Sequence, residues 1–211
     1  DNTRIAYVAD AEADDRFELY VVPAEGGFPV QVCGSLVAGG DVEAFRWAPD
    51  GSRLAFIADA ETDGQYELYT ALPDGSGRVK ASGSLPAGGD VYGDHLSALP
   101  PGSASATAFA WSPDSARIAY VADETVDGTF EAYVAPAAGG GSLRVSGAID
   151  AGANVNFVIW SPDGARTLHQ GRTGGTPDLF SVAYDGTGSV RLSQGGEDVG
   201  LSAPFGAVVA I

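Results

Sequence analysis

The chain repeats one short pattern at regular intervals. Trp47-Ala48-Pro49-Asp50 returns as Trp111-Ser112-Pro113-Asp114 and again as Trp160-Ser161-Pro162-Asp163. Each copy is followed two residues later by an arginine and an apolar run, and the chain opens on such a run without the Trp motif. These arginines, spaced 49, 64 and 49 residues apart, are Arg4, Arg53, Arg117 and Arg166. A fixed period of 49 residues with one 15-residue insertion near 92–106 predicts a single repeat domain over residues 1–211.

One repeat contains four short strand patterns. Pro, Asp, Gly and Ser mark tight turns between the apolar runs, and the run after Arg53 alternates as a strand does. The strands expected in the second repeat cover residues 44–47, 53–58, 66–71 and 78–82. Four antiparallel strands per repeat is the pattern of a β-propeller blade, whose faces are covered by stacking around an axis. The sequence therefore predicts an all-β propeller of about four four-stranded blades.

The repeats resemble those of a known family. The W-[SA]-P-D-G-x-R-[IL]-A-[YF] pattern, followed by an E-L-Y strand and a P-x-x-G-G turn, looks like the WD-like repeats of TolB-type propellers. The same blades are similar to the N-terminal propellers of prolyl-oligopeptidase-type enzymes. This resemblance implies a propeller fold and partner contacts at the cell envelope. Peptidase activity is not implied, because the chain has no room for a separate hydrolase domain. The three Trp residues are expected to pack blades together.

Both ends of the chain fall inside a blade. Residues 1–4 match the turn before a second strand, and residues 203–211 resemble residues 48–56, so the terminal blade is split between the two ends. Three arrangements remain open: a closed four-bladed ring, part of a larger propeller, or strands shared between copies in an oligomer or fibre. The last arrangement makes the C-terminal segment a contact surface, with Phe205, Val208, Val209 and Ile211 as its apolar residues.

Composition narrows the classes of partner. The net charge of −17 disfavours nucleic acid, and no apolar stretch is long enough for a membrane span. The chain contains no Met, so either a signal peptide or pro-segment was removed or the chain is a piece of a longer protein. We expect the first alternative and an exported protein, extracellular or periplasmic. The one cysteine, Cys33, aligns with Ser82 and Ser146 and is expected to be a small residue at a strand end.

Acidic residues recur in the loop between the second and third strands. Because a hard cation takes several oxygens from one turn, this pattern allows a calcium site. The candidate ligands are Asp10, Asp14, Asp59, Glu61, Asp63, Asp123 and Asp127. The alternative is that the Asp side chains accept backbone hydrogen bonds in a hairpin loop. In that alternative, Glu18, Glu67 and Glu131 are solvent-facing strand residues.

The insertion is the second candidate site. It breaks the period, so blade packing does not require it, and extra loops on rigid scaffolds often carry recognition. Its candidate contact residues are Tyr92, Asp94, His95 and Leu96. Neither this cluster nor the rest of the chain has a nucleophile motif, so we expect no enzymatic activity.

These observations give two function hypotheses. The first is an exported, non-enzymatic protein-interaction or assembly propeller that polymerises through its open terminal strands. The second is a carbohydrate- or calcium-binding propeller module detached from a larger secreted enzyme.

Overall fold

The computed structural model describes residues 3–92, 109–147, 150, 152–173 and 176–193. These residues form four antiparallel sheets, one per repeat, which we call blades 1 to 4 in chain order. Blade 1 contains β1 (Arg4–Ala9), β2 (Glu18–Pro23) and β3 (Val30–Gln31). Blade 2 contains β4 (Val42–Trp47), β5 (Leu54–Ala58), β6 (Glu67–Ala71) and β7 (Val79–Lys80). Blade 3 contains β8 (Phe109–Trp111), β9 (Arg117–Ala122), β10 (Glu131–Pro136) and β11 (Leu143–Arg144). Blade 4 contains β12 (Val158–Trp160), β13 (Arg166–Thr173), β14 (Thr176–Ala183) and β15 (Val190–Arg191).

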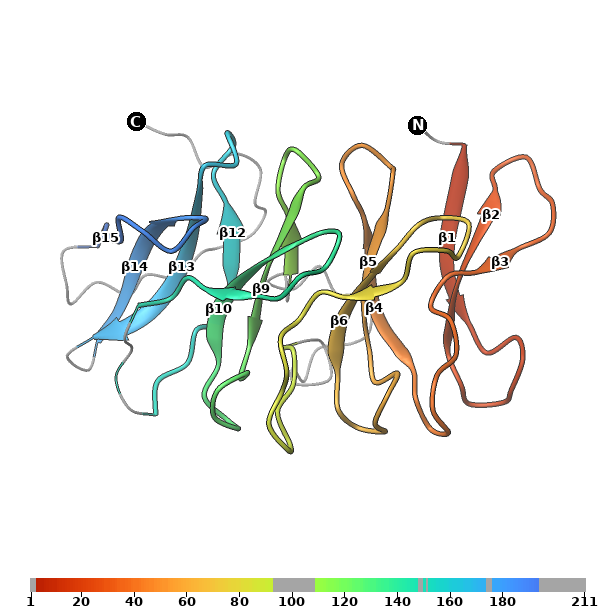
Figure 1. Ribbon diagram of the computed structural model, residues 1–211, viewed down its shortest axis with the longest axis horizontal. Helices are drawn as coiled ribbons and strands as arrows, with labels where there is room; N and C mark the ends of the chain where they lie inside the picture. Colours follow the sequence, from red (N-terminus) through yellow and green to blue (C-terminus); the bar gives the residue numbers. More distant parts are fainter. Residues whose placement is uncertain (1–2, 93–108, 148–149, 151, 174–175, 194–211) are drawn as a thin grey trace.

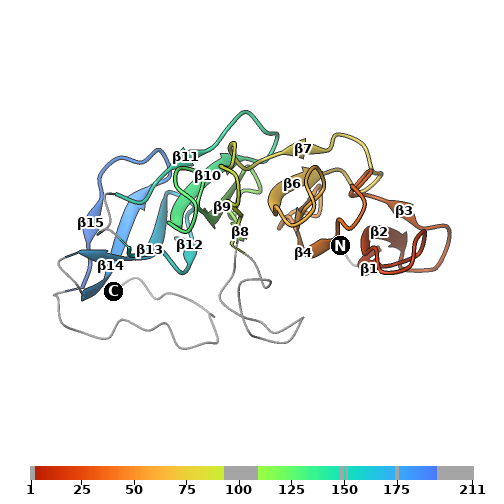
Figure 2. The same ribbon diagram turned by 90° about the horizontal axis from the view of Figure 1, so that it is seen from below.

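The four blades stand side by side in chain order (Figure 1). Seen along the row, they form an arc in which the short outer strands β3, β7, β11 and β15 follow the convex rim (Figure 2). Blades 1 and 4 lie at opposite ends of this arc. The described residues thus have the blade architecture of a propeller, arranged as an open arc.

The predicted strands of the second repeat lie within two residues of β4 to β7, except that the last strand is shorter. β7 pairs with β6 only through Tyr69 with Lys80 and Thr70 with Val79. The Trp motif forms the turn before the second strand, where Gly51 and Gly164 have φ of 71° and 69°. In blade 3 the Ser112 and Arg117 backbones and side chains close the same turn, since Ser112 Oγ accepts the Arg117 amide at 2.9 Å.

The insertion interrupts the first strand of blade 3. Val91 forms an isolated bridge with Ala122, and pairing with β9 resumes at Phe109 opposite Tyr120. Blade 2 shows the uninterrupted version, in which Val42 pairs with Ala58 and the ladder continues after one irregular position. The insertion therefore falls between two described segments, Val91 and Phe109–Trp111, that both pair with β9. Residues 93–108 themselves lie outside the described part of the chain.

Blade 1 has three strands in the order β1-β2-β3, so among the described residues no strand occupies the place that β4, β8 and β12 hold in the other blades. This gap is where the split-blade prediction puts a terminal strand. Residues 203–211, which that prediction assigns to the gap, are outside the described ranges. Among the described residues, no helix has the length and hydropathy needed to cross a bilayer.

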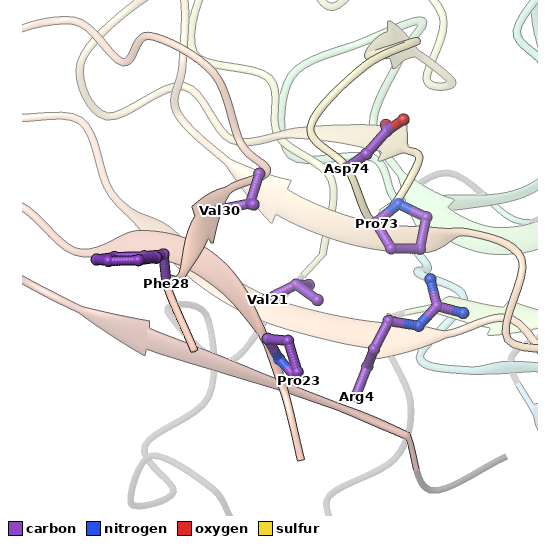
Figure 3. Close-up of a pocket in the computed structure, with 7 residues that line it drawn as sticks. All are labelled: Arg4, Val21, Pro23, Phe28, Val30, Pro73 and Asp74. Atoms are coloured by element: carbon purple, nitrogen blue, oxygen red, sulfur yellow. The ribbon is translucent and has the colours of Figure 1, made fainter. Parts of the chain in front are cut away.

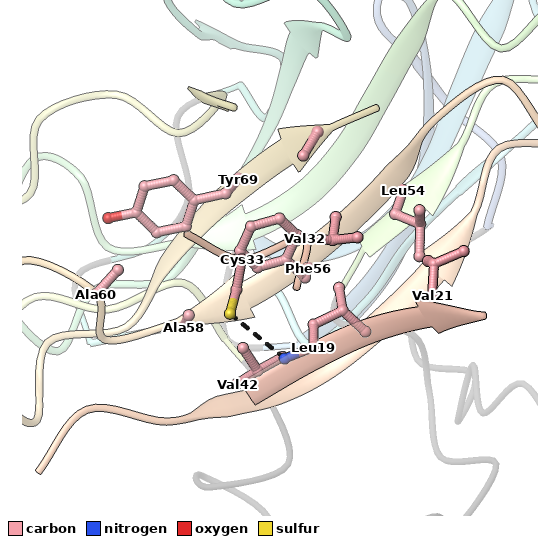
Figure 4. Packing of buried hydrophobic residues seen from close by; sticks show 11 residues of the cluster. Leu19, Val21, Val32, Cys33, Val42, Leu54, Phe56, Ala58, Ala60 and Tyr69 are labelled. Atoms are coloured by element: carbon pink, nitrogen blue, oxygen red, sulfur yellow. Dashed lines mark hydrogen bonds between the residues drawn. The ribbon is translucent and has the colours of Figure 1, made fainter. Parts of the chain in front are cut away.

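The core lies between blades rather than inside one blade. Each cluster joins one face of a blade to the opposite face of the next, and Figure 4 shows this for blades 1 and 2. Leu19, Val21 and Val32 of blade 1 pack against Leu54 and Phe56 of blade 2, and all are buried.

We call the side of a blade that meets the next blade its forward face, and the other its backward face. Alternation along the strands fixes which residues belong to each.

Cys33 confirms the alignment of the repeats. Its Sγ accepts the amide of Leu19 at 3.4 Å (dashed in Figure 4). In each of the other blades a serine hydroxyl accepts the corresponding amide at 3.1 Å; these serines are Ser82, Ser146 and Ser193. The thiol is fully buried, and burial is the main cause that raises its pKa. Cys33 is therefore the small strand-end residue that the alignment predicts.

Candidate assembly interface

Tryptophan joins blades 3 and 4 to the blade before each of them. The indole Nε1 of Trp111 donates to the carbonyl of Arg46 at 3.2 Å, and that of Trp160 donates to the carbonyl of Ala110 at 2.9 Å. In both cases the acceptor lies in the first strand of the preceding blade. This confirms the prediction that the Trp residues serve blade packing, and it shows that the preceding first strand supplies the acceptor.

A buried aspartate fixes the first strand to its own blade. Asp59 accepts the backbone amides of Asp41 (2.5 Å) and Gly64 (2.9 Å), one with each carboxylate oxygen. Asp123 repeats this with Asp90 (2.5 Å) and Gly128 (2.7 Å). Both aspartates are 1% exposed. Because Asp41 and Asp90 lie directly before the first strands, each carboxylate holds a first strand against the hairpin loop beside it.

Two further hydrogen bonds connect the start of each first strand to the preceding blade. The side chains of Asp41, Asp90 and Asn154 accept the amides of Phe17, Tyr66 and Phe130 at 2.7, 2.7 and 2.9 Å. The carbonyls of those three residues in turn accept the amides of Val42, Val91 and Val155. We call this pair of bonds the linker clamp, since it ties each linker to the blade it leaves.

The edge of β1 has the same partners in place, but no strand of the described part of the chain lies between them. Asp10 aligns with Asp59 and Asp123, yet it is exposed and accepts no hydrogen bond from a described residue. Trp47 should donate to the first strand of blade 1, but its indole finds no acceptor within the described ranges, and the Arg4 guanidinium lies 5.3 Å from its ring centre. Ile5, on the backward face, is 52% exposed, whereas its counterparts Leu54 and Ile118 are fully buried.

The acidic loops show the hairpin arrangement rather than a converging set of ligands. Asp59 and Asp123 use their oxygens on backbone amides, and Glu61 pairs with Lys80 at 2.9 Å. Asp63 packs against Gly39 and Asp127 against Gly88, in the linkers, while Asp14 is exposed. Among the described residues, no three His, Cys, Asp or Glu side chains are placed to hold a metal ion. The calcium site therefore stays a prediction without geometric support.

The recurring glutamates are buried, so their assignment as solvent-facing residues is wrong. Glu18, Glu67 and Glu131 are 1–5% exposed. Each accepts the hydroxyl of a tyrosine two residues later and pairs with a cation, as Glu67 does with Tyr69 and Lys80. Together with burial, the bond to Glu67 raises the pKa of Tyr69. Alternation along the strand places Glu and Tyr on one face, and this signal was available in the sequence.

The predicted contact residues of the insertion and the C-terminus are mostly outside the described chain. Tyr92 is described: its ring meets Phe130 edge-on at 5.4 Å and packs on the cluster between blades 3 and 4. Asp94, His95 and Leu96 lie outside the described ranges, as do Phe205, Val208, Val209 and Ile211. Those positions remain predictions.

One surface feature was not predicted from the sequence. A cavity of about 260 Å³ lies where the β2–β3 turn of blade 1 approaches the β6–β7 turn of blade 2 (Figure 3). Val21, Pro23 and Val30 line it, with Arg4 and Asp74 as its charged groups. Phe28 lies at one side of it and is 94% exposed. A single Phe in a Gly-Pro turn carries no sequence signal of such a cavity.

No protein-family model matches the sequence, and no curated protein matches it. Solved structures do resemble the fold. A protein described as TolB from Agrobacterium tumefaciens is 16% identical, with a TM-score of 0.53 over 90% of this chain and 61% of that one. An oligogalacturonate lyase in complex with manganese is 16% identical, with a TM-score of 0.51 over 87% and 46%.

A puromycin-hydrolyzing peptidase of Mycobacterium tuberculosis is 17% identical, with a TM-score of 0.58 over 90% of this chain and 27% of that one. The chain thus spans about three fifths of the first of these structures and less than half of the other two. At these identities the likeness concerns the fold alone. The fold of this chain is TolB-like, built from β-propeller blades.

Proposed function

We propose that this protein is an exported, non-enzymatic assembly propeller that accepts a β-strand along the open edge of β1. The proposal rests on groups at that edge that bond to a first strand in blades 2 and 3 but have no described strand to bond to in blade 1. An incoming strand would pair with β1, offer a backbone amide to Asp10 and offer a carbonyl to Trp47. Internal blades make all three contacts, so the edge is shaped for a strand before one arrives.

Three sources can supply this strand. The C-terminal residues of the same chain would close a split blade within one molecule. Further blades of a larger propeller would supply it in a longer protein. The C-terminal residues of another copy would produce an oligomer or fibre, and this is the source that we propose. Its contact residues would be Phe205, Val208, Val209 and Ile211.

Light scattering behind size exclusion tests the source of the strand. Strand sharing predicts a mass above the 21.4 kDa of one chain. It also predicts return to monomer when residues 203–211 are deleted. Full-length protein that is monomeric at every concentration would contradict sharing between copies. In that case, loss of stability on the same deletion would indicate closure within one chain.

Asp10→Ala gives a second, more local test. It removes the carboxylate that would accept the backbone amide of the incoming strand, and it leaves every described hydrogen bond intact. We expect weaker association at unchanged monomer stability. Asp14→Ala, in the same exposed loop, is the matched control and should leave the mass distribution as it is.

The cavity beside Phe28 favours a second candidate, the carbohydrate-binding module. Ligand sites are concave and largely apolar with a few polar groups, and an exposed aromatic ring can stack on a sugar. Phe28, Arg4 and Asp74 provide that combination. Screening of oligosaccharides by calorimetry tests this candidate, because Phe28→Ala should abolish any heat of binding without changing the mass in solution.

A further inference from the structure

Among the described residues, no blade covers the forward face of blade 4, although the same face of each other blade packs against the next blade. Leu192 aligns with Val32, Ala81 and Val145, which are 0–3% exposed, yet Leu192 is 52% exposed. The alignment is fixed by the backbone, since each of these residues donates its amide to the corresponding carbonyl of the third strand. This face is therefore a blade-packing surface without a described blade on it.

This face carries large apolar side chains together with two polar ones, Gln170 and Ser181. Leu168 stands where blades 2 and 3 have Ala55 and Ala119, and it pairs with Ile159 across the sheet. Ile159, Pro162, Leu168 and Leu192 line a cavity of about 160 Å³ on this side of blade 4. Large apolar side chains around an unfilled cavity are typical of a docking surface rather than a solvated face.

The internal interfaces show what such a face receives. In each one, the turn glycine of the next blade lies on the outer strand of the preceding blade. The Cβ positions of Gly75, Gly139 and Gly186 are 3.4, 3.3 and 3.7 Å from side-chain atoms of Val30, Val79 and Leu143. At the ends of the arc, no described residue lies within 4 Å of the Cβ position of Gly26. Val190, the counterpart of Val30 and Leu143, is 51% exposed, compared with 40% and 45% for those two residues.

We propose that the forward face of blade 4 binds the backward face of blade 1 in a second copy of this chain. Ile5 would then cover the leucines, and Gly26 would lie on Val190. The inference deepens the proposed assembly function and rests on it, since it names a second contact, between sheet faces, besides the strand edge. Such a contact is head-to-tail, so it propagates into a filament or closes into a ring.

Two further observations favour this pairing. Residues 4–33 carry six acidic residues and two arginines, whereas residues 158–193 carry three arginines and three aspartates. Head-to-tail stacking therefore avoids bringing two acidic blades together. In addition, Pro177 replaces Phe17, Tyr66 and Phe130 and has no amide, so the linker clamp cannot form at blade 4 through this residue. One of the two bonds of the linker clamp is therefore missing at this end of the arc.

Complementation between two variants of the full chain tests the proposal. Leu192→Asp places a charge on the forward face, and Ile5→Asp places one on the backward face. Val126→Asp is the matched control, because Val126 is 59% exposed in the β9–β10 loop, away from both faces. Near-UV circular dichroism should show that all three variants remain folded.

The native chain and Val126→Asp should associate equally. Each face variant alone should need at least tenfold more protein to associate. Mixed together, Leu192→Asp and Ile5→Asp should form a one-to-one dimer and nothing larger, since each retains the face that the other has lost. A monomeric native chain, or a mixture that stays monomeric, would overturn the proposal.

The same experiment separates this inference from strand sharing. Leu192→Asp leaves the edge of β1 and residues 203–211 untouched. If the deletion of 203–211 dissolves the oligomer but Leu192→Asp does not, face stacking is wrong and strand sharing stands. If Leu192→Asp dissolves it and the deletion does not, the faces hold the assembly and the strand edge does not.

Discussion

Blades 3 and 4 share a register and an apolar core but differ in their polar contacts. Blade 3 holds its first strand through buried Asp123 and stacks Tyr120 on Tyr133. Blade 4 has Arg172 at the position of Asp123 and stacks His169 on Phe180 instead. Blade 3 is covered on both faces, whereas no described blade covers the forward face of blade 4. The comparison indicates that the apolar pattern defines a blade, while the polar contacts inside it vary from one blade to the next.

The buried aspartate should give the largest difference in stability. Asp123→Ala leaves the amides of Asp90 and Gly128 without their acceptor, so we expect a loss of about 4 kcal/mol in the free energy of unfolding. Asp10→Ala, at the equivalent but exposed position of blade 1, should cost under about 0.5 kcal/mol. Urea denaturation followed by tryptophan fluorescence measures both. Equal losses would mean that the carboxylate does not depend on a first strand.

His169 should make blade 4 sensitive to acid. Burial lowers its pKa from 6.5 to about 4, and its buried Nδ1 has no hydrogen-bond partner among the described residues. The neutral form is favoured in the folded state, so its stabilising effect is complete above pH 6.5. It is lost as the pH falls towards 4, because the unfolded chain takes up the proton first; the loss is about 3 kcal/mol.

His169→Phe places the residue of blade 2 at this position, since Phe56 aligns with it. Comparing the two proteins at each pH removes the contribution of the carboxylates that they share. The difference in unfolding free energy between His169→Phe and the native chain should therefore grow as pH falls from 7 to 4. A difference independent of pH would show that the pKa of the histidine is the same in the folded and unfolded chains.

The indole bonds should give a smaller effect that separates a complete interface from an open one. Trp160→Phe removes the donor to Ala110, with an expected cost of about 1 kcal/mol beyond the loss of ring area. Trp47→Phe loses the same area but no described hydrogen bond, so the difference between the two variants isolates the bond. Thermal unfolding at a concentration where the chain is monomeric provides the measurement.

Cys33→Ser should have the smallest effect. It introduces the residue that the three other blades use to accept the same amide, so we expect a change within about 1 kcal/mol in the free energy of unfolding. A larger loss would mean that blade 1 packs its strand end differently from the other blades, although its outer strand pairs in the same register as theirs.

Some features were readable from the sequence because they are local. The alternation after Arg53 predicted β5, the Trp motifs predicted turns, and the period placed Cys33 with the strand-end serines. The sequence also placed Glu67 beside Tyr69 on one face. It could not reveal that this face is buried, because the covering atoms come from a blade that is 49 residues away in the chain.

By itself, the sequence determined the number of repeats, their four-strand pattern and the position of the insertion. These follow from turn chemistry and from the two-residue period of strands, which act over a few residues. Only the tertiary structure decided which carboxylates are buried, that Trp111 and Trp160 bond to the blade before them, and that Ile5 and Leu192 are left uncovered. Those properties depend on contacts between blades, and burial is set by which neighbour is present.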